Sequence, residues 1–379
     1  MKYFLVAGEP SGDLHGSNLM RGLLESDPEA EFRFWGGDAM ASVGGSESLL
    51  KHYKESSFFG LVEVLRNLKT ISAQLEQCKA SITEWRPDAV ILIDYPGFNM
   101  KIARFAKQSG IKVFYYIAPK VWASREGRIK AMRRYIDHLF IIFPFEQQYF
   151  AERGIKPHFC GNPLTDALNA SIDHLPSNEQ FIAAENLGER PIVALLSGSR
   201  KSEILNNLPL MVDTMRSLPA YQGVVAGVEW VDKSIYDKIL KDSDIKIVYD
   251  KTYSLVRAAE AAIVCSGTAT LETALLGTPQ VVLYRVRVIL KLLRPLIIHT
   301  KHISLVNINL GRESVHEVVQ VSNDKSETLK ALKDILKGGK GRTKMLKDYK
   351  ELSAIIGESG ASKRFAKKMV EILKTTLNS

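Results

Sequence analysis

The chain has 379 residues, of which 45% are hydrophobic and 25% are charged, and its formal net charge is +9. These values are typical of a globular protein with two domains, and no apolar run is long enough to span a membrane. The positive charge favours acidic partners such as nucleotides, phosphorylated sugars or anionic lipids, whereas no recognisable motif points to nucleic acid.

Apolar runs alternate with helical patterns along the whole chain, which predicts parallel sheets built from βαβ units. Strands are expected over 2–7, 32–37, 89–94, 113–118, 138–143 and 158–161, with helices over 61–85 and 100–109. A polar stretch over 169–190 is interpreted as the interdomain connection. Beyond it, strands are expected over 192–198, 223–228, 245–250, 261–266 and 280–285, and helices over 325–336, 343–356 and 362–377. The fold class is therefore α/β, with two doubly wound Rossmann-like domains whose strand carboxyl ends line one cleft.

The first strand runs into Gly8-Glu9-Pro10-Ser11-Gly12-Asp13, where a loop meets a helix. Its small residues allow a ligand to approach closely, and Asp13 could cap the following helix. The candidate binding residues here are Glu9, Ser11, Gly12 and Asp13. The motif lacks GxGxxG spacing, and no Walker A sequence occurs anywhere, so a purely structural turn is the alternative.

The segment before the helix at 61–85 is unusually apolar for a loop. It could receive acyl chains or dip into a bilayer, and packing in the core is an equally good interpretation. The residues concerned are Phe58, Phe59, Leu61, Val62 and Leu65.

The third of these runs delivers Asp94 into Asp-Tyr-Pro-Gly-Phe-Asn. A carboxylate at the end of an apolar strand is costly unless it is paired or exposed in a cleft. There it could act as a general base whose pKa is raised by apolar neighbours. The alternative is a turn-forming Asp before Pro-Gly, and Asn99 could cap the next helix.

The fourth run ends in Ala118-Pro-Lys-Val-Trp-Ala-Ser-Arg125, and a basic helix follows it. The cations of this run and of the helix could bind the phosphate of an acceptor or membrane headgroups, or they could form a solvated face. They are Lys120, Arg125, Arg128, Lys130, Arg133 and Arg134.

In the second half, Ser197-Gly198-Ser199-Arg200 again follows an apolar strand with a turn of small residues. Arg200 would enter the cleft, where its planar guanidinium can hold a diphosphate and neutralise a departing nucleotide. Glu203 could hold Arg200 in place.

A second turn, Ser266-Gly267-Thr268, separates the strand at 261–266 from a helix that carries Glu272 about one turn from its start. Free backbone N–H groups and the helix dipole favour an anion such as a diphosphate there. Glu272 could accept hydrogen bonds from two ribose hydroxyls. The alternative is the tight corner of an ordinary α/β unit.

Between Glu272 and Glu313 the chain has no acidic residue, while six cations are spaced through an apolar stretch. The stretch is too short and too charged to cross a bilayer, but it suits an anionic membrane surface, through Ile289, Leu292 and Leu293 among others. The alternative is a buried element with snorkelling Lys and Arg side chains.

Several chemistries find no support. The eight histidines form neither an HExxH pair nor a close cluster, Asp242 and Asp244 fall in a polar turn, and no GxSxG elbow occurs. We therefore expect neither a metal nor a cofactor. Three separated cysteines without a CxxC pair are typical of a reducing cytoplasm.

Taken in order, the motifs GEPSGD, FFGLVEVL, DYPGFN, APKVWASR, GNPLTD, SGSR, CSGTATLE, LYR and SLVNINLGRESVHEVVQ resemble the lipid-A-disaccharide synthases, glycosyltransferases of GT-B type. The resemblance covers nearly the whole chain. It implies an acceptor-binding domain over 1–168, a UDP-sugar-binding domain over 169–357, and a C-terminal helix over 358–379 that returns to the first domain. The implied reaction joins UDP-2,3-diacylglucosamine to 2,3-diacylglucosamine 1-phosphate through a β-1,6 linkage, with inversion at the anomeric carbon, and releases UDP.

The resemblance also implies roles for individual residues. Asp94 matches the proposed base, Arg200 the cation on the diphosphate, and Glu272 the carboxylate on the uridine ribose. Asn307, Arg312 and Glu313 match an NxxxxRE block that closes the donor side. The chain departs from the family at Pro10, where Thr is frequent, at Ser197, where PGSR is usual, and in APKVWASR, where SPSVWAWR is common; these changes put the pocket's shape in doubt.

The resemblance implies a cytoplasmic protein that contacts the inner face of an anionic inner membrane peripherally. Its oligomeric state stays open, a homodimer included. Two other functions remain: a UDP-N-acetylglucosamine 2-epimerase, which has little use for the apolar segments, and a non-catalytic adaptor at a lipid surface, which leaves the two anion sites unexplained.

Overall fold

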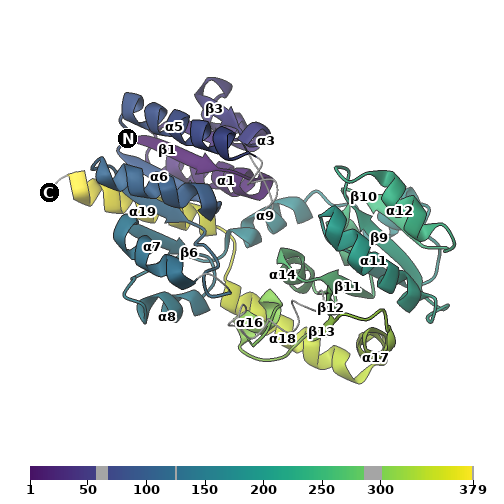
Figure 1. Cartoon of the computed structure of the whole chain (residues 1–379). Coiled ribbons are helices and arrows are strands. Elements are labelled where there is room, and N and C mark those ends of the chain that lie inside the picture. The colour runs from purple at the N-terminus through teal and green to yellow at the C-terminus, as the bar shows by residue number, and fades with distance from the viewer. Residues whose placement is uncertain (57–66, 124–125, 286–300, 378–379) are drawn as a thin grey trace. The chain divides into compact units, whose positions relative to one another are not determined.

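The computed structural model describes residues 1–56, 67–123, 126–285 and 301–377. The chain divides into two compact units, of which the first contains Met1–Ala167 and Ile356–Ser379 and the second Leu168–Ile355. Each unit is a parallel sheet with helices on both faces (Figure 1). This is the α/β fold with two Rossmann-like units that the alternating pattern predicts.

The first sheet has seven strands in the order β3-β2-β1-β4-β5-β6-β7, all parallel. The strands are β1 (Lys2–Ala7), β2 (Glu31–Gly36), β3 (Leu49–His52), β4 (Ala89–Ile93), β5 (Lys112–Tyr116), β6 (His138–Ile141) and β7 (His158–Phe159). The helices of this unit are α1 (Pro10–Ser26), α2 (Asp38–Gly44), α3 (Tyr53–Ser56), α5 (Leu68–Trp85), α6 (Pro96–Gln108), α7 (Ile129–Tyr135), α8 (Phe145–Ala151) and α19 (Ala361–Leu377).

Alternating side chains of β1 enter two separate cores. Tyr3 and Leu5 pack with α1 and α19 on one face, whereas Phe4 and Val6 pack with α5 and α6 on the other. Such continuous burial explains why the strand reads as one apolar run. Strand order reverses between β1 and β4, and parallel α/β sheets bind ligands outside the carboxyl ends of strands at such a switch point.

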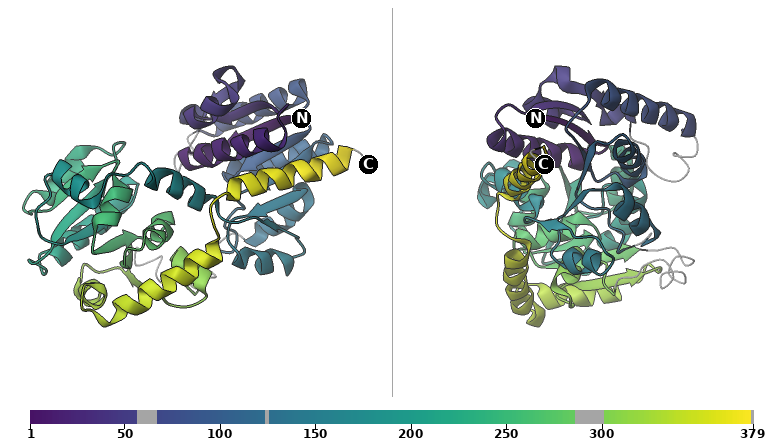
Figure 2. Two further views of the ribbon diagram at one scale, coloured as in Figure 1. Left: turned by 180° about the vertical axis from the view of Figure 1, so that it is seen from behind. Right: turned by 90° about the vertical axis from the view of Figure 1, so that its left-hand side faces the viewer.

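The C-terminal helix α19 belongs to the first unit, as the resemblance implies. It lies alongside α1 (Figure 2) and buries Phe365, Met369 and Leu373 at four-residue spacing. Asp166 caps its first turn by accepting hydrogen bonds from the N–H groups of Gly360, Ala361 and Ser362, at 2.5, 3.1 and 2.7 Å.

The second sheet has six parallel strands in the order β10-β9-β8-β11-β12-β13, with its switch point between β8 and β11. The strands are β8 (Ile192–Leu196), β9 (Gln222–Gly227), β10 (Lys246–Tyr249), β11 (Ala261–Cys265), β12 (Gln280–Arg285) and β13 (His316–Gln320). The helices are α10 (Asn178–Ala184), α11 (Lys201–Met215), α12 (Lys233–Leu240), α13 (Thr252–Ala258), α14 (Thr268–Leu275), α16 (Leu305–Leu310), α17 (Ser326–Ile335) and α18 (Lys340–Ile356), and α9 (Pro163–Ile172) crosses from one unit to the other.

The stretch at 169–190 is more ordered than a connecting segment. It contains the end of α9 and all of α10, whose Phe181 is buried in the core of the second unit. A capping box starts α10, because Ser177 accepts from the N–H of Gln180 and the Gln180 side chain accepts from the N–H of Ser177. Within the described residues, no helix combines the length and apolar character needed to cross a bilayer.

Candidate active site

One candidate region lies within the first unit, at the switch point of its sheet. Glu9 follows β1 as the residue before α1, and Asp94 follows β4. The two strands are paired up to Ala7 and Ile93, so the structure brings both acidic residues to one edge. Gly8 makes room for this arrangement, because a Cβ atom there would lie 2.4 Å from the ring of Tyr95.

Asp94 is held in an unusual backbone conformation. It and Tyr95 have φ angles of 43° and 46°, a left-handed region that costs energy for residues other than glycine. Hydrogen bonds from the sheet hold the Asp94 backbone there: its N–H donates to the carbonyl of Tyr116 at 3.1 Å, and the Tyr115 hydroxyl donates to its main-chain oxygen at 2.5 Å. Burial raises the pKa of its half-buried carboxyl, while Lys120 and the backbone of Tyr95 oppose that rise. A raised pKa suits a general base.

Asn99 ties β1 and β4 together just below Asp94. Its Nδ2 donates to the carbonyls of Val6, Ile93 and Asp94 at 3.3, 3.2 and 2.8 Å. The prediction that Asn99 caps the next helix was wrong, since it lies inside α6 and its side chain turns back to the strand ends.

Asp13 is buried in the first turn of α1 but serves a different helix. It accepts hydrogen bonds from the N–H groups of Gly37, Ala39 and Met40 at 2.7, 3.0 and 3.0 Å, and so caps α2. The predicted cap on its own helix was wrong. Ser11 is exposed beside it and Gly12 is buried against Ala7; binding of substrate by Ser11, Gly12 and Asp13 stays a prediction.

The second candidate region lies within the second unit, at the switch point of its sheet, where the SGSR loop follows β8. Gly198 has a φ of +113°, and a Cβ atom there would lie 2.5 Å from the Cβ of Glu203. Glycine therefore allows Glu203 to fold back and accept from the N–H groups of Ser199 and Arg200 at 3.0 and 3.3 Å. Glu203 also contacts the Arg200 guanidinium at 3.5 Å, which remains 70% exposed.

The neighbouring strand β11 ends in the other predicted turn. Gly267 precedes α14, Thr268 is its first residue, and the Ser266 hydroxyl donates to the carbonyl of Ile303 at 3.2 Å. The start of α14 thus presents backbone N–H groups at the carboxyl edge of the sheet, the arrangement that suits an anion. Burial raises the pKa of Glu272 one turn into α14, and a hydrogen bond of 2.9 Å from the Tyr253 hydroxyl opposes that rise.

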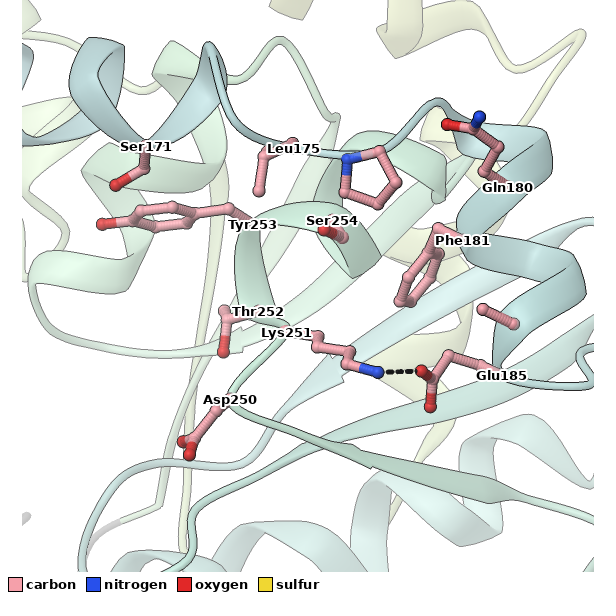
Figure 3. A pocket seen from close by; sticks show the side chains of 12 residues that line it. Ser171, Leu175, Gln180, Phe181, Glu185, Asp250, Lys251, Thr252, Tyr253 and Ser254 are labelled. Carbon is pink, nitrogen blue, oxygen red and sulfur yellow. Dashed lines mark hydrogen bonds and ion pairs between the residues drawn. The ribbon is translucent and has the colours of Figure 1, made fainter.

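A cavity of about 680 Å³ adjoins this second part of the site (Figure 3). Tyr253, the donor to Glu272, lies on its wall together with residues of the α9–α10 segment and of the loop after β10. Lys251 and Glu185, which form an ion pair, both line it. The lining residues are Ser171, Leu175, Pro176, Gln180, Phe181, Ala184, Glu185, Asp250, Lys251, Thr252, Tyr253 and Ser254.

The predicted NxxxxRE block is not gathered at this edge. Asn307 is fully buried, and its amide both accepts from the N–H groups of Ser314 and Val315 and donates to Val315 and Glu317. Arg312 forms ion pairs with Asp348 and Glu351 of α18 at 2.9 and 2.5 Å. Glu313 precedes β13, at the amino edge of that strand, where it contacts His316 at 3.0 Å. A role of the block in donor binding stays a prediction.

Two residues near the second switch point were missed by sequence reasoning. Asn207 donates to the carbonyl of Ser197 and to Cys265 Sγ at 3.1 and 3.2 Å, which ties β8 to β11. Trp230 is 72% exposed and donates to the carbonyl of Ser199 at 3.0 Å. Neither belongs to a short motif; only the position of Trp230 in the loop after an apolar strand could have drawn attention.

The apolar segments predicted to meet lipid lie outside the described residues. This concerns Phe58, Phe59, Leu61, Val62, Leu65, Ile289, Leu292 and Leu293. Across residues 1–56, 67–123, 126–285 and 301–377, no group of His, Cys, Asp and Glu side chains is arranged to hold a metal ion.

The fold resembles solved structures of nucleotide-sugar enzymes. A UDP-GlcNAc 2-epimerase from Neisseria meningitidis, bound to UDP-GlcNAc, matches with a TM-score of 0.70 at 13% identity over 100% of both chains. The epimerase from Methanocaldococcus jannaschii, in complex with UDP-GlcNAc and UDP, matches with a TM-score of 0.66 at 14% identity over 99% of this chain and 100% of the other. At such identities the likeness shows the fold alone.

Sequence comparison is more specific. The model of the family described as lipid-A-disaccharide synthetase matches residues 3–370. A lipid-A-disaccharide synthase from Syntrophus aciditrophicus is 35% identical over 377 residues, which cover 98% of this chain and 97% of the relative. Another from Geobacter metallireducens is 34% identical over 383 residues, with coverage of 98% and 97%. The chain therefore belongs to the lipid-A-disaccharide synthase family.

Proposed function

We propose that this chain transfers the sugar of UDP-2,3-diacylglucosamine to the 6-hydroxyl of 2,3-diacylglucosamine 1-phosphate, with inversion at the anomeric carbon. As a member of its family the chain is a glycosyltransferase of lipid A disaccharide synthesis. The observation that carries the detailed proposal is the contrast between the two switch points. One presents the carboxylate of Asp94, and the other presents helix N–H groups, hydroxyls and Arg200.

Asp94 is the general base in this proposal. Its raised pKa, caused by burial, lets it accept the proton of the acceptor 6-hydroxyl as that oxygen attacks the anomeric carbon. The hydrogen bonds from Tyr115 to its main-chain oxygen and from its own N–H to Tyr116 fix the backbone, so the carboxylate is oriented before the substrate arrives.

The donor occupies the second unit in this proposal. The N–H groups at the start of α14, the Thr268 hydroxyl and the exposed Arg200 guanidinium stabilise the negative charge that develops on the leaving UDP. Glu272 accepts hydrogen bonds from the ribose hydroxyls. Tyr253 occupies one of its carboxylate oxygens, Oε1, and so leaves the other for the ribose.

Contact with the membrane is part of the proposal, because both substrates carry acyl chains. Exposed cations on α6 and α7 suit the anionic headgroups on the cytoplasmic side of an inner membrane. They are Lys101, Arg104, Lys130, Arg133 and Arg134.

The test supplies both acylated sugars in detergent micelles and follows the products by mass spectrometry. We expect disaccharide 1-phosphate and UDP in equal amounts. A parallel incubation with UDP-N-acetylglucosamine alone should give no epimer. The proposal would be contradicted if the folded protein formed no disaccharide in the micelles, or if it formed the epimer.

A further inference from the structure

A buried carboxylate that the proposed reaction does not use lies at the same carboxyl edge of the first sheet as Asp94, two strands away. Glu146 is the second residue of α8, which follows β6, and it is 1% exposed. Its Oε1 accepts from the indole N–H of Trp122 at 2.9 Å, and its Oε2 accepts from the N–H groups of Ile142 and Phe143 at 3.2 and 3.1 Å. All three partners are donors, so the ionised carboxylate fits them best.

Trp122 connects Glu146 to the loop that follows β5. Its indole packs edge-on against Phe145 with 5.1 Å between ring centroids. The loop makes two tight turns, in which the N–H of Val121 donates to Pro119 at 2.6 Å and the N–H of Ala123 donates to Lys120 at 3.1 Å. Trp122 is thus a buried anchor of this loop, and Lys120, two residues earlier, is exposed.

Lys120 lies near both carboxylates. β5 is the neighbour of β4 in the sheet, so the loop after β5 starts beside Asp94. The positive charge of Lys120 lowers the pKa of Asp94 against the larger effect of burial, and it does the same for Glu146, whose pKa burial raises to about 7.

We propose that Glu146, acting through Trp122, is a positioning residue that fixes the loop so that Lys120 stabilises the anionic form of Asp94. The inference rests on the proposed function, since it assigns a purpose to the charge state of the base. The consequence is that Lys120, held in place by Glu146 and Trp122, sets the acidic end of the pH range in which the enzyme works.

Other charged and titratable groups near Asp94 are expected to keep their positions when Lys120 is changed. The Tyr115 hydroxyl donates to the main chain of Asp94. Burial raises the pKa of that hydroxyl, and the positive charge of Arg128 opposes the rise. Burial and the negative charge of Glu9 raise the pKa of the neighbouring Tyr95, whose backbone N–H donates to the Asp94 carboxylate. A difference between the wild type and a Lys120 variant therefore isolates the one charge.

The experiment measures kcat and kcat/KM for disaccharide formation against pH. Lys120→Met keeps the length of the side chain and removes its charge, and it should move the acidic limb upward by about 0.5–1 pH unit. Glu146→Gln places an amide among donors and should move the limb in the same direction. Trp122→Phe, which keeps the ring and loses the N–H, should do so too.

Asp27→Asn is the matched control. Asp27 is also buried and accepts from a ring-borne donor, the Tyr3 hydroxyl at 3.1 Å, but it lies at the opposite end of the same sheet. This variant should leave the limb in place even if it lowers stability.

The inference is overturned if Lys120→Met raises the KM for the acceptor without moving the acidic limb, because the cation would then bind substrate phosphate. It is equally overturned if Glu146→Gln leaves the limb unchanged; should that variant fail to fold, Trp122→Phe decides in the same way. These outcomes are separate from failure of the proposed function, in which the wild-type protein forms no disaccharide at any pH.

Discussion

At both switch points an asparagine amide links two strand ends, but the residues beyond that amide differ in their chemistry. In the first unit the amide of Asn99 bridges the ends of β1 and β4, and in the second the amide of Asn207 bridges the ends of β8 and β11. Above Asn99 the chain presents the carboxylates of Glu9 and Asp94. Above Asn207 it presents a glycine loop, an exposed arginine and the start of a helix.

This contrast separates scaffold from function. Two parallel sheets that reverse at the corresponding place in their strand order support, in the proposed mechanism, a base in one unit and an anion site in the other. The local backbone differs accordingly, because left-handed Asp94 and Tyr95 hold a carboxylate in a fixed position, whereas Gly198 lets Glu203 fold back onto the SGSR loop and Gly267 precedes the N–H groups at the start of α14. Substitutions at both switch points test whether this division between the two units holds.

The largest effect is expected for Asp94→Asn, which should lower kcat by about 10²–10⁴-fold because the general base is lost. Asparagine tolerates the left-handed backbone, so the fold should survive. Burial raises the pKa of Asp94 in the folded state, so its contribution to stability falls as the pH rises between the unfolded and folded pKa values. The variant should therefore be at least as stable as the wild type at pH 8, measured by thermal unfolding.

Asp88→Asn is its control, since Asp88 accepts from the N–H of Lys2 at the opposite end of β4. It should keep near wild-type turnover. Equal turnover of the two variants would remove the assignment of Asp94 as base.

Arg200→Ala should lower kcat by about 10²–10³-fold, because one charge contact to the leaving diphosphate is lost. Arg190→Ala removes another partly exposed arginine from the other end of β8, where it pairs with Asp244 at 2.5 Å. Steady-state rates with saturating acceptor compare the two. If Arg190→Ala is as slow as Arg200→Ala, the loss reflects general charge and not the switch point.

The hydrogen bonds of Asn99 and Asn207 should contribute differently to the free energy of unfolding. Asn99→Ala deprives three carbonyl oxygens of a donor, whereas Asn207→Ala deprives one carbonyl and a thiol, which is a weak acceptor. Each should cost about 1–3 kcal/mol of stability, with the larger cost for Asn99. Urea unfolding midpoints measure both, and a larger loss for Asn207→Ala would reverse the comparison.

The smallest effect is expected for Tyr253→Phe. Without the hydroxyl, the pKa of Glu272 should rise further, so donor binding should weaken a few-fold below neutral pH and recover as the pH rises. The KM for the donor at pH 6 and pH 8 measures this. Tyr221→Phe, which removes a hydroxyl donated to Glu260 at the amino edge of β11, should change neither value; a similar loss there would deny Tyr253 a special role.

The central strands of both sheets could be predicted because they are buried on both faces and read as apolar runs. β3 was missed because this edge strand is only half-buried and ends in Lys51 and His52. β13 was missed for a similar reason, since it starts at exposed His316 and its buried residues alternate with half-buried ones. The capping box at Ser177 and Gln180 was a readable signal for α10 that its polar composition concealed.

The candidate site was predictable where a residue follows a strand in the sequence, as Asp94 and Arg200 do. It was not predictable where the partner is distant. Asp13 caps a helix 24 residues further on, and Glu146 meets Trp122 across the same interval. Arg312 reaches α18 over 36 residues. Such contacts depend on which strands become neighbours, and no local pattern records that.

The return of α19 to the first unit has a consequence for biosynthesis. The face of β1 that carries Tyr3 and Leu5 is completed only by a helix that is made after the whole second unit, and 195 residues separate Asp166 from Ala361. At about 5–20 residues per second, the ribosome needs roughly 10–40 s to add them. During that interval the apolar face that α19 covers has no partner, so the first unit can reach its native state only after the second unit has been made.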